Sequence, residues 1–159
     1  MLRYDTLNTP CGPLRLVIDE IGLCRVDFID AATPCVNGQA DPIVLRPYRE
    51  QFAAWFAGQR QRFELPLSLH GTPFQLAVWQ ALAEIPFGQT RSYAQQAASL
   101  QRPKAVRAVG AANGRNPLPI ILPCHRVIGS HGSLTGYAGG LERKRWLLAH
   151  EQQVLLHRP

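Results

Sequence analysis

The chain has 159 residues, 46% of them hydrophobic, and a formal net charge of +6. This length can bury a substantial core, in one domain or in two small ones. No apolar run approaches the length of a membrane span and the first residues lack a signal peptide's apolar core, so we expect a soluble, cytoplasmic protein. The four cysteines include no Cys-x-x-Cys pair, which argues against a zinc ribbon or a redox motif.

Charge is unevenly distributed along the chain. Residues 1–84 contain seven arginines and nine acidic residues, whereas residues 85–159 contain ten basic residues and two acidic ones. Between Ile85 and Leu141 there is no aspartate or glutamate at all. Such a segment attracts a polyanion in a salt-dependent way, so we expect DNA, and no membrane, as the partner.

The N-terminal part predicts a small antiparallel sheet and one helix. Residues 2–8 and 14–29 mix apolar and polar side chains between turn residues, which is typical of a meander of strands. Residues 30–42 have no periodicity and predict a surface loop. Aromatic side chains recur at helical spacing over residues 47–57, and we expect a further strand and connection over residues 59–70.

We place a boundary after residue 70, which gives domains 1–70 and 71–159. The second domain is predicted to be mainly helical, with Thr72 and Ser92 as N-terminal caps of its first two helices. The last helix is expected to run from Leu141 to about His150. The fold class is therefore α/β (α+β), with a sheet-and-helix domain followed by a helical one.

Two short helices of the second domain, residues 93–100 and 104–113, are separated by a turn and predict a helix-turn-helix. The second helix is slender because its small side chains recur along it, at Ala105, Ala108, Ala111 and Ala112. A slender helix suits either a close approach to a nucleic-acid groove or tight packing inside the protein.

Residues 117–129 bring Cys124, His125 and Arg126 together at the end of an apolar run. A lone cysteine in such a run is more often a small buried side chain than a nucleophile. Here a base and a fixed positive charge stand beside the thiol and would favour the thiolate. Because neighbouring side chains on a strand point to opposite faces, either the backbone turns at Cys124 or a water bridges the pair. The histidine needs an orienting carboxylate, either Glu142 or Glu151.

The chain resembles the O6-alkylguanine-DNA alkyltransferases. The resemblance rests on motifs spread over almost the whole chain: Thr9-Pro10-Cys11-Gly12-Pro13-Leu14, Pro86-Phe87-Gly88, Arg102-Pro103-Lys104-Ala105-Val106-Arg107-Ala108-Val109-Gly110, Asn116-Pro117-Leu118-Pro119, Pro123-Cys124-His125-Arg126-Val127, Gly136-Tyr137-Ala138-Gly139-Gly140 and Trp146-Leu147-Leu148-Ala149-His150-Glu151. It implies a ribonuclease-H-like N-terminal domain and a winged-helix-like C-terminal domain.

The same resemblance implies a chemistry. Cys124 would take the alkyl group from O6 of a damaged guanine in DNA, or from O4 of an alkylated thymine, in a single, irreversible turnover. His125 would accept the thiol proton through a water, Glu151 would orient His125, and Tyr93 would protonate the leaving guanine. No cofactor, no metal and no obligate protein partner are expected, and the protein would act as a monomer.

The resemblance also implies how DNA is held. The second helix of the helix-turn-helix would lie in the minor groove, and Arg107 would replace the flipped-out nucleotide. We expect contacts with DNA from Arg107, Tyr93, Ala105, Ala111, Asn113, Arg115 and Arg126. We expect the extruded base to meet Asn116, Val127, Tyr137, Ala138 and Gly139.

Two features depart from some members of this family. Ala138 stands where the mammalian proteins have serine, which removes one hydroxyl from the expected base pocket. Cys24 and His70 are at best part of the zinc-ligand set that other members carry, so no metal site is predicted.

The sequence is also compatible with two other classes of function. A group of alkyltransferase-like proteins related to the family that this chain resembles binds the lesion without repairing it, but these proteins lack the cysteine that is present here as Cys124. A Cys-His-Glu hydrolase of amides or esters would need an oxyanion hole, and it would leave the basic segment unexplained.

Overall fold

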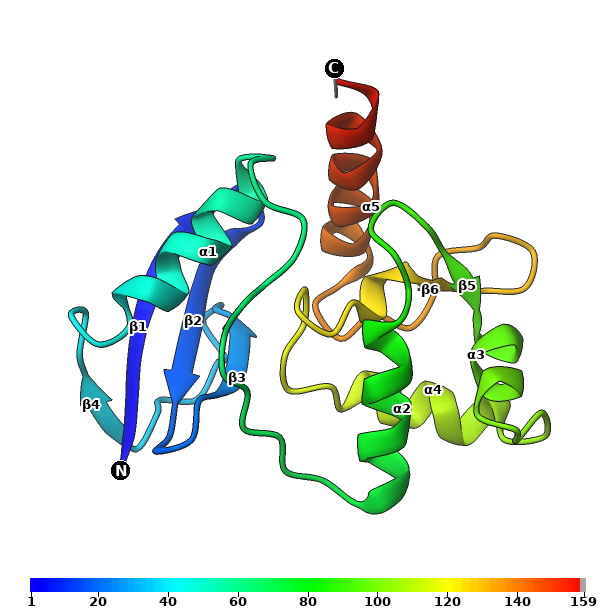
Figure 1. Cartoon of the computed structure of the whole chain (residues 1–159), viewed down its shortest axis with the longest axis horizontal. Coiled ribbons are helices and arrows are strands. Elements are labelled where there is room, and N and C mark those ends of the chain that lie inside the picture. The colour runs from blue at the N-terminus through cyan, green and yellow to red at the C-terminus, as the bar shows by residue number, and fades with distance from the viewer. Residues whose placement is uncertain (158–159) are drawn as a thin grey trace. The chain divides into compact units, whose positions relative to one another are not determined.

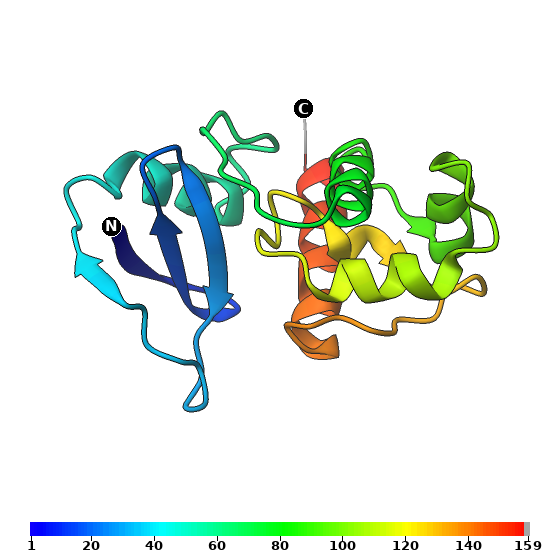
Figure 2. The same ribbon diagram turned by 90° about the horizontal axis from the view of Figure 1, so that it is seen from below.

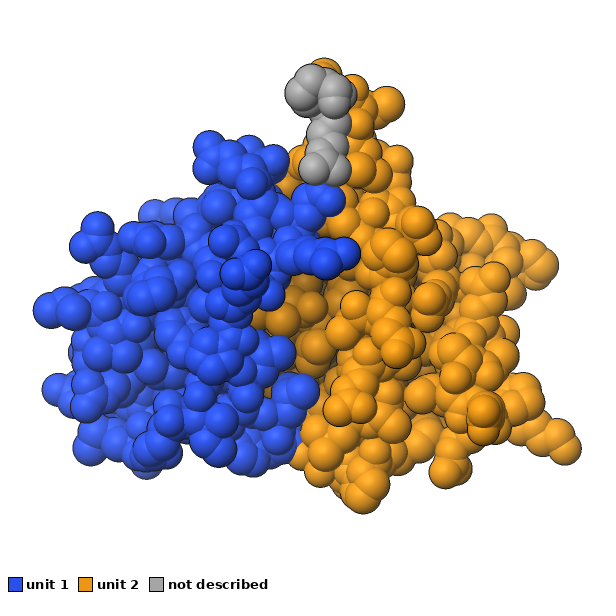
Figure 3. Space-filling view, viewed as in Figure 1, with its two compact units in different colours: residues 1–70 blue, residues 71–159 orange. Residues whose placement is uncertain are grey.

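A computed structural model describes residues 1–157. They form two compact units, Met1–His70 and the described residues from Gly71 onward (Figure 3). We call these unit 1 and unit 2. The predicted mixture of a small sheet with several helices is confirmed, since unit 1 contains the larger sheet and unit 2 most of the helices (Figure 1).

Unit 1 is built on a four-stranded sheet with the strand order β3-β2-β1-β4. Strands β1 (Leu2–Thr9), β2 (Gly12–Ile18) and β3 (Leu23–Phe28) pair antiparallel, as the sequence pattern predicts. On β2, Leu14 and Leu16 are fully buried, and Leu16 lies opposite Val26 of β3. Alternate residues of β2 therefore face the core of the unit.

Two parts of unit 1 differ from the prediction. Strand β4 (Gly38–Ala40) pairs parallel with β1 inside the segment predicted to be a loop. Its three residues are exposed, so no hydrophobic alternation marks it. The strand predicted within residues 59–70 is wrong, because only a bridge between Leu23 and Leu67 forms there. Pro66 precedes Leu67 and has no N–H to donate to a ladder.

Helix α1 (Arg46–Phe56) covers one face of the sheet (Figure 2). Its aromatic stripe of Phe52, Trp55 and Phe56 is buried, as the helical spacing predicts. Arg49 of α1 pairs with Asp5 of β1 at 2.7 Å, and Asp5 lies opposite Leu16 in the sheet register. The face of the sheet that carries Asp5, Leu14 and Leu16 is therefore the face toward α1.

Unit 2 begins with α2 (Pro73–Ala83), followed by β5 (Arg91–Ser92), α3 (Tyr93–Ser99) and α4 (Val106–Gly114). The predicted caps are confirmed: Thr72 and Ser92 each form a capping box, with Gln75 and Gln95 respectively. Trp79 of α2 donates its indole N–H to the carbonyl oxygen of Ala112 on α4 at 2.8 Å. This buried hydrogen bond fixes α4 against α2.

The remaining elements of unit 2 are a short 3-10 helix η1 (Cys124–Arg126), β6 (Val127–Ile128) and α5 (Leu141–Leu156). Strand β6 pairs parallel with β5, which joins segments far apart in the sequence. Helix α5 runs beyond the predicted end near His150, so Glu151 lies inside it. Leu141, the first residue of α5, is 44% exposed. None of the helices in residues 1–157 is long and apolar enough to cross a membrane.

Candidate active site and nucleic-acid interface

The cysteine and its two neighbours lie on one turn of 3-10 helix. The Arg126 N–H donates to the Pro123 carbonyl oxygen at 2.9 Å, so the backbone turns at Cys124 rather than continuing as a strand. The structure thus shows the backbone turn, one of the two arrangements that the sequence left open for Cys124 and His125. Cys124 is 9% exposed and His125 is fully buried.

Glu151, which lies on α5, anchors the turn that carries Cys124, His125 and Arg126. Its Oε2 lies 2.6 Å from His125 Nε2, and the Arg126 guanidinium donates to both of its carboxylate oxygens at 2.9–3.0 Å. Because the carboxylate accepts the proton on Nε2, the basic lone pair of the neutral imidazole is on Nδ1. Of the two carboxylates that the sequence offered, the structure thus places Glu151 on the histidine.

Burial and charge set the protonation states in this cluster. The pKa of Glu151 is lowered to about 2 by His125 and Arg126, which together outweigh the opposing effect of burial. Burial lowers the pKa of His125, which is therefore neutral at pH 7. Burial also raises the pKa of Cys124 to about 11, against a smaller lowering by Asn116 and Lys144. The thiol is therefore protonated at pH 7 and needs a base, so the cations beside it do not by themselves produce a thiolate.

Asn116 fastens the segment that leads to the cysteine. Its Nδ2 donates to the Leu122 carbonyl oxygen at 2.7 Å, and its Oδ1 accepts from the Leu118 N–H at 2.9 Å. A hydrogen bond from Asn116 also lowers the pKa of Cys124. The asparagine therefore braces the loop before η1 and contacts the thiol.

Tyr93 and Lys144 also lie near the thiol. Tyr93 follows β5, and the pairing of β5 with β6 brings it beside the segment after Cys124. Its hydroxyl donates to the Thr135 carbonyl oxygen at 3.1 Å, and Lys144 Nζ lies 5.9 Å from the centre of its ring. Burial raises the pKa of Tyr93, and the nearby Cys124 adds to the effect.

Lys144 is the residue that sequence reasoning missed. It is fully buried, and its Nζ donates to the Val127 and Thr135 carbonyl oxygens at 2.6 and 2.8 Å. Between Arg143 and Arg145 it looks like part of an exposed charged run. Its helical spacing was the available signal, because Lys144, Leu147 and Glu151 fall on one face of α5 and all three are buried.

The proposed base-contacting residues lie around this cluster in different environments. Val127 is fully buried and Tyr137 is 9% exposed. Ala138 is exposed and Gly139 is half-buried. Val127 belongs to β6, and the other three lie in the segment between β6 and α5.

Helix α4 presents a slender exposed face. Val109 and Ala112 are buried, whereas Arg107, Ala108, Ala111 and Gly114 are exposed. Arg115 is exposed just beyond the helix, and Ala105 is half-buried at its start. A single long cation thus projects from a surface otherwise made of small side chains.

Two residues predicted to contact DNA are instead buried, and their side chains form hydrogen bonds within unit 2. Asn113 is 5% exposed, and its amide exchanges hydrogen bonds with that of Gln96 at 2.8 and 3.0 Å. Arg126 is 6% exposed, and besides Glu151 it donates to the Ile85 carbonyl oxygen at 2.7 Å. Both side chains are committed to the core, so the structure corrects this part of the prediction.

Comparison with family models matches both units. Residues 2–69 match the 6-O-methylguanine DNA methyltransferase, ribonuclease-like domain, and residues 73–153 match the 6-O-methylguanine DNA methyltransferase, DNA binding domain. The chain belongs to the 6-O-methylguanine DNA methyltransferase family. The predicted resemblance to the O6-alkylguanine-DNA alkyltransferases is thereby confirmed.

Individual relatives agree with this family. The chain is 47% identical to the methylated-DNA–protein-cysteine methyltransferase of Methanosarcina barkeri, over 96% of this chain and 98% of the relative. It is also 47% identical to the constitutive methylated-DNA–protein-cysteine methyltransferase of Bacillus subtilis, over 94% of each chain.

A solved structure has the same fold. The O6-methylguanine methyltransferase of Mycobacterium tuberculosis matches with a TM-score of 0.90 and 44% identity, over 96% of this chain and 94% of that one. The Mycobacterium tuberculosis OGT protein in complex with DNA matches with the same TM-score and identity.

The charge network of this methyltransferase-family chain predicts acid lability. Glu151 has a lower pKa in the folded chain than its usual 4.5, so the unfolded chain takes up its proton first. The stabilisation is present above pH 4.5 and is lost as the pH falls towards 2, by about 3 kcal/mol. His125 also makes the folded chain less stable as the pH falls below 6.5, because its pKa in the folded chain is lowered from that value. Denaturant unfolding at several pH values should show this slope.

In the same experiment, Glu151→Gln should be less stable at pH 7 and should have a flatter profile between pH 4.5 and 2. The exposed Glu142, in the first turn of α5, offers a matched control, and Glu142→Gln should keep the wild-type profile. Equal slopes for Glu151→Gln and the wild type would refute the assignment.

Proposed function

We propose that this protein repairs alkylated DNA by transferring the alkyl group from O6 of guanine to Sγ of Cys124, once per molecule. One observation carries the proposal: a nearly buried thiol lies beside a neutral imidazole that an anionic carboxylate fixes at 2.6 Å. This is the arrangement in which a base activates a nucleophile of high pKa. The names of the relatives, as cysteine methyltransferases acting on methylated DNA, agree with it.

The reaction begins with removal of the thiol proton. His125 accepts that proton on Nδ1, through a bridging water, while Glu151 keeps the other ring nitrogen protonated. The resulting imidazolium lies beside the Glu151 carboxylate, which stabilises its charge. The Lys144 ammonium offsets the charge on the thiolate, since it lowers the pKa of Cys124.

The thiolate then attacks the alkyl carbon. A carbon–sulfur bond forms, the bond between that carbon and guanine O6 breaks, and the electron pair stays with the base. Tyr93 donates its phenolic proton to the departing guanine, and the Lys144 ammonium, which lies against the Tyr93 ring, stabilises the phenolate that remains. The product is a thioether, which is not hydrolysed like a thioester, so each molecule acts once and needs no cofactor.

A guanine oxygen in a stacked pair is out of reach of a nearly buried thiol, so the nucleotide must be flipped out. We propose that the exposed face of α4 enters the minor groove, with α3 and α4 as the helix-turn-helix. Arg107 fills the space of the extruded nucleotide, while Ala105 and Ala111 allow close approach and Arg115 contacts phosphate. Tyr93 supports the rotated backbone.

The flipped base meets the segment around the cysteine in this proposal. Tyr137 supplies an aromatic face, and the backbone of Val127, Ala138 and Gly139 reads the base edge. Asn116 holds Cys124 in place for attack. O4-alkylthymine is a further candidate substrate, since it presents an alkylated oxygen in a similar position.

All the side chains that this mechanism uses come from unit 2 of one chain, which supports action as a monomer without an obligate protein partner. Cys24, Cys35 and Cys124 are free thiols, which agrees with work in a reducing compartment such as the cytoplasm.

The first prediction concerns the product. After incubation with a short duplex that contains O6-methylguanine, mass spectrometry should find one methyl group on the peptide of Cys124, saturating at one per protein molecule. Cys124→Ala should gain none and should still bind the duplex. An unmodified wild-type protein that binds the lesion duplex would instead support a lesion-binding module, and catalytic ester or amide cleavage would support the hydrolase.

The second prediction concerns the base. The rate of methyl transfer by the wild type should be level from pH 7 upward and fall below pH 6.5, as His125 takes up a proton. His125→Gln should lower the rate at pH 7 by about 100-fold or more. Its rate should then rise about tenfold per pH unit, because a thiol with a pKa of about 11 must ionise unaided. A level profile for His125→Gln would contradict a base role for His125.

The third prediction separates flipping from phosphate contact. Arg107→Ala should lower the rate of transfer from duplex DNA about tenfold or more, and should leave transfer from the free base O6-methylguanine unchanged. Arg115→Ala should mainly weaken DNA binding and reduce the salt dependence of affinity by about one ion. If Arg107→Ala behaves like Arg115→Ala, Arg107 is only a phosphate contact.

A further inference from the structure

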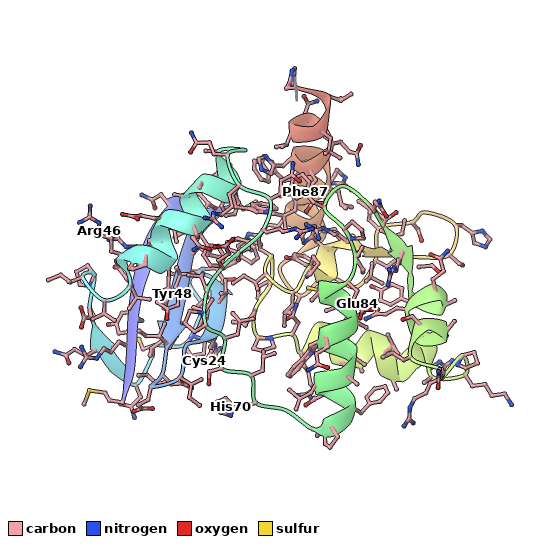
Figure 4. All side chains as sticks on the ribbon, viewed as in Figure 1. Cys24, Arg46, Tyr48, His70, Glu84 and Phe87 are labelled. Carbon is pink, nitrogen blue, oxygen red and sulfur yellow. The ribbon has the colours of Figure 1, made fainter. Side chains whose placement is uncertain are left out.

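Unit 1 contains a cavity of about 270 Å³ to which the proposed repair chemistry assigns no role. Its lining comes from the sheet, from the connection between β3 and β4, and from the end of the unit. Figure 4 labels two of the lining residues, Cys24 on β3 and His70. The others that matter here are Arg15 and Arg25 on the strands, and Cys35 in the connection.

The cavity lies on the face of the sheet that α1 does not cover. Leu14 and Leu16 point toward α1, so the intervening Arg15 and the following Val17 point to the opposite face. Arg15 lies opposite Asp27, and Val17 lies opposite Arg25, on β3. In Figure 2 the connection between β3 and β4 swings away from α1, and its residues 34–37 close the cavity.

Arg15 has a buried donor that the rest of the structure leaves unused. The residue is 7% exposed, and its Nη2 donates to Asp27 Oδ2 at 3.0 Å. Its Nε is buried and has no hydrogen-bond partner among residues 1–157. Arg25 donates its own Nε to the other Asp27 oxygen at 2.9 Å. One carboxylate thus serves two guanidinium groups, and Asp27 alone can balance only one of their two charges.

A buried N–H of a charged group is costly without an acceptor, because burial removes its hydrogen bonds to water. An anionic oxygen in the cavity would supply the acceptor and compensate the charge, since charge-assisted hydrogen bonds to guanidinium are strong. The remaining walls are largely apolar, from Leu2, Val17, Pro34 and Val36. They suit the body of a ligand rather than a second charged group.

We propose that this cavity of unit 1 binds a small organic anion, with a carboxylate or phosphate group on Arg15 and Arg25 and an apolar body against the segment 34–37. The volume equals that of about nine water molecules, which admits a single substituted ring but nothing much larger.

Of the other polar residues at the cavity, Cys24 and His70 have hydrogen-bond partners elsewhere, and Asn37 carries no charge. The Cys24 thiol donates to the Val17 carbonyl oxygen at 3.5 Å, and His70 Nε2 lies 3.0 Å from Ser68 Oγ. Ser68 Oγ in turn donates to Asp19 at 2.6 Å. Within residues 1–157 no group of three or more His, Cys, Asp or Glu side chains is placed to hold a metal ion. The guanidinium pair is therefore the recognition element.

Binding can be measured on the full-length protein with three probes that share a phenyl ring. Benzoate carries a carboxylate, phenyl phosphate carries a phosphate, and benzamide is the neutral counterpart of benzoate. In an NMR titration, one of the two anions should shift the resonances of unit 1 residues at the cavity saturably. Benzamide should bind at least about tenfold more weakly. The tighter anion identifies whether the natural ligand is a carboxylate or a phosphate.

Arg15→Met keeps the apolar stem and should weaken binding of the preferred anion at least about tenfold. Arg25→Met, at a side chain that is 54% exposed, should weaken anion binding severalfold. If Arg15→Met does not fold, Arg25→Met provides the test. Arg60→Met, at another arginine of unit 1 that does not line the cavity, is the control and should bind as the wild type does.

Three results would overturn the proposal: no saturable shift with either anion, benzamide binding as tightly as benzoate, or unchanged binding by the folded arginine variants. The exposed Cys35 gives a second readout, because ligand in the cavity should slow its alkylation by iodoacetamide. Methyl transfer to Cys124 is measured separately on unit 2, so failure of this inference and failure of the repair function are distinguishable.

Discussion

The proposed active site depends on the hydrogen bonds that the buried carboxylate of Glu151 accepts. This carboxylate is fully buried and accepts from His125 and Arg126, and its Oε1 also accepts the Gly88 N–H at 2.9 Å. A buried carboxylate is stable only with such a set of partners. One residue of α5 therefore fixes the histidine, the turn that carries the cysteine, and the turn after α2.

The environment of Cys124 also determines the protonation state of its thiol before substrate binds. A resting thiolate would be exposed to adventitious electrophiles, whereas burial keeps the Cys124 thiol protonated with a pKa of about 11. His125 is kept neutral by burial and is oriented by Glu151, so the base is ready before the substrate arrives. Arg126, which the sequence suggests is a DNA contact or a partner of the thiol, instead holds Glu151 ionised and stacks over Phe87 at 5.5 Å.

The two units use arginine in different ways. In unit 2, Arg107 projects from a helix of small residues, where its charge and length suit insertion into DNA. In unit 1, Arg15 is buried in a sheet and shares Asp27 with Arg25, so its free Nε faces no acceptor among residues 1–157. An exposed cation steers a polyanion, whereas a buried, partly paired one selects a small ligand of matching shape.

The sequence by itself determined the elements with strong local signals. The meander of β1 to β3, the aromatic stripe of α1 and the caps at Thr72 and Ser92 follow from alternation, helical spacing and side-chain capping, which act between near neighbours. The cysteine, its histidine and the two candidate carboxylates, Glu142 and Glu151, could also be identified from the sequence. Only the tertiary structure decided that Glu151 is the carboxylate on His125, that Asn113 and Arg126 are buried, and that Lys144 lies beside the thiol. Burial and pairing of these polar groups depend on which distant segments pack together, and no local pattern along the chain encodes that.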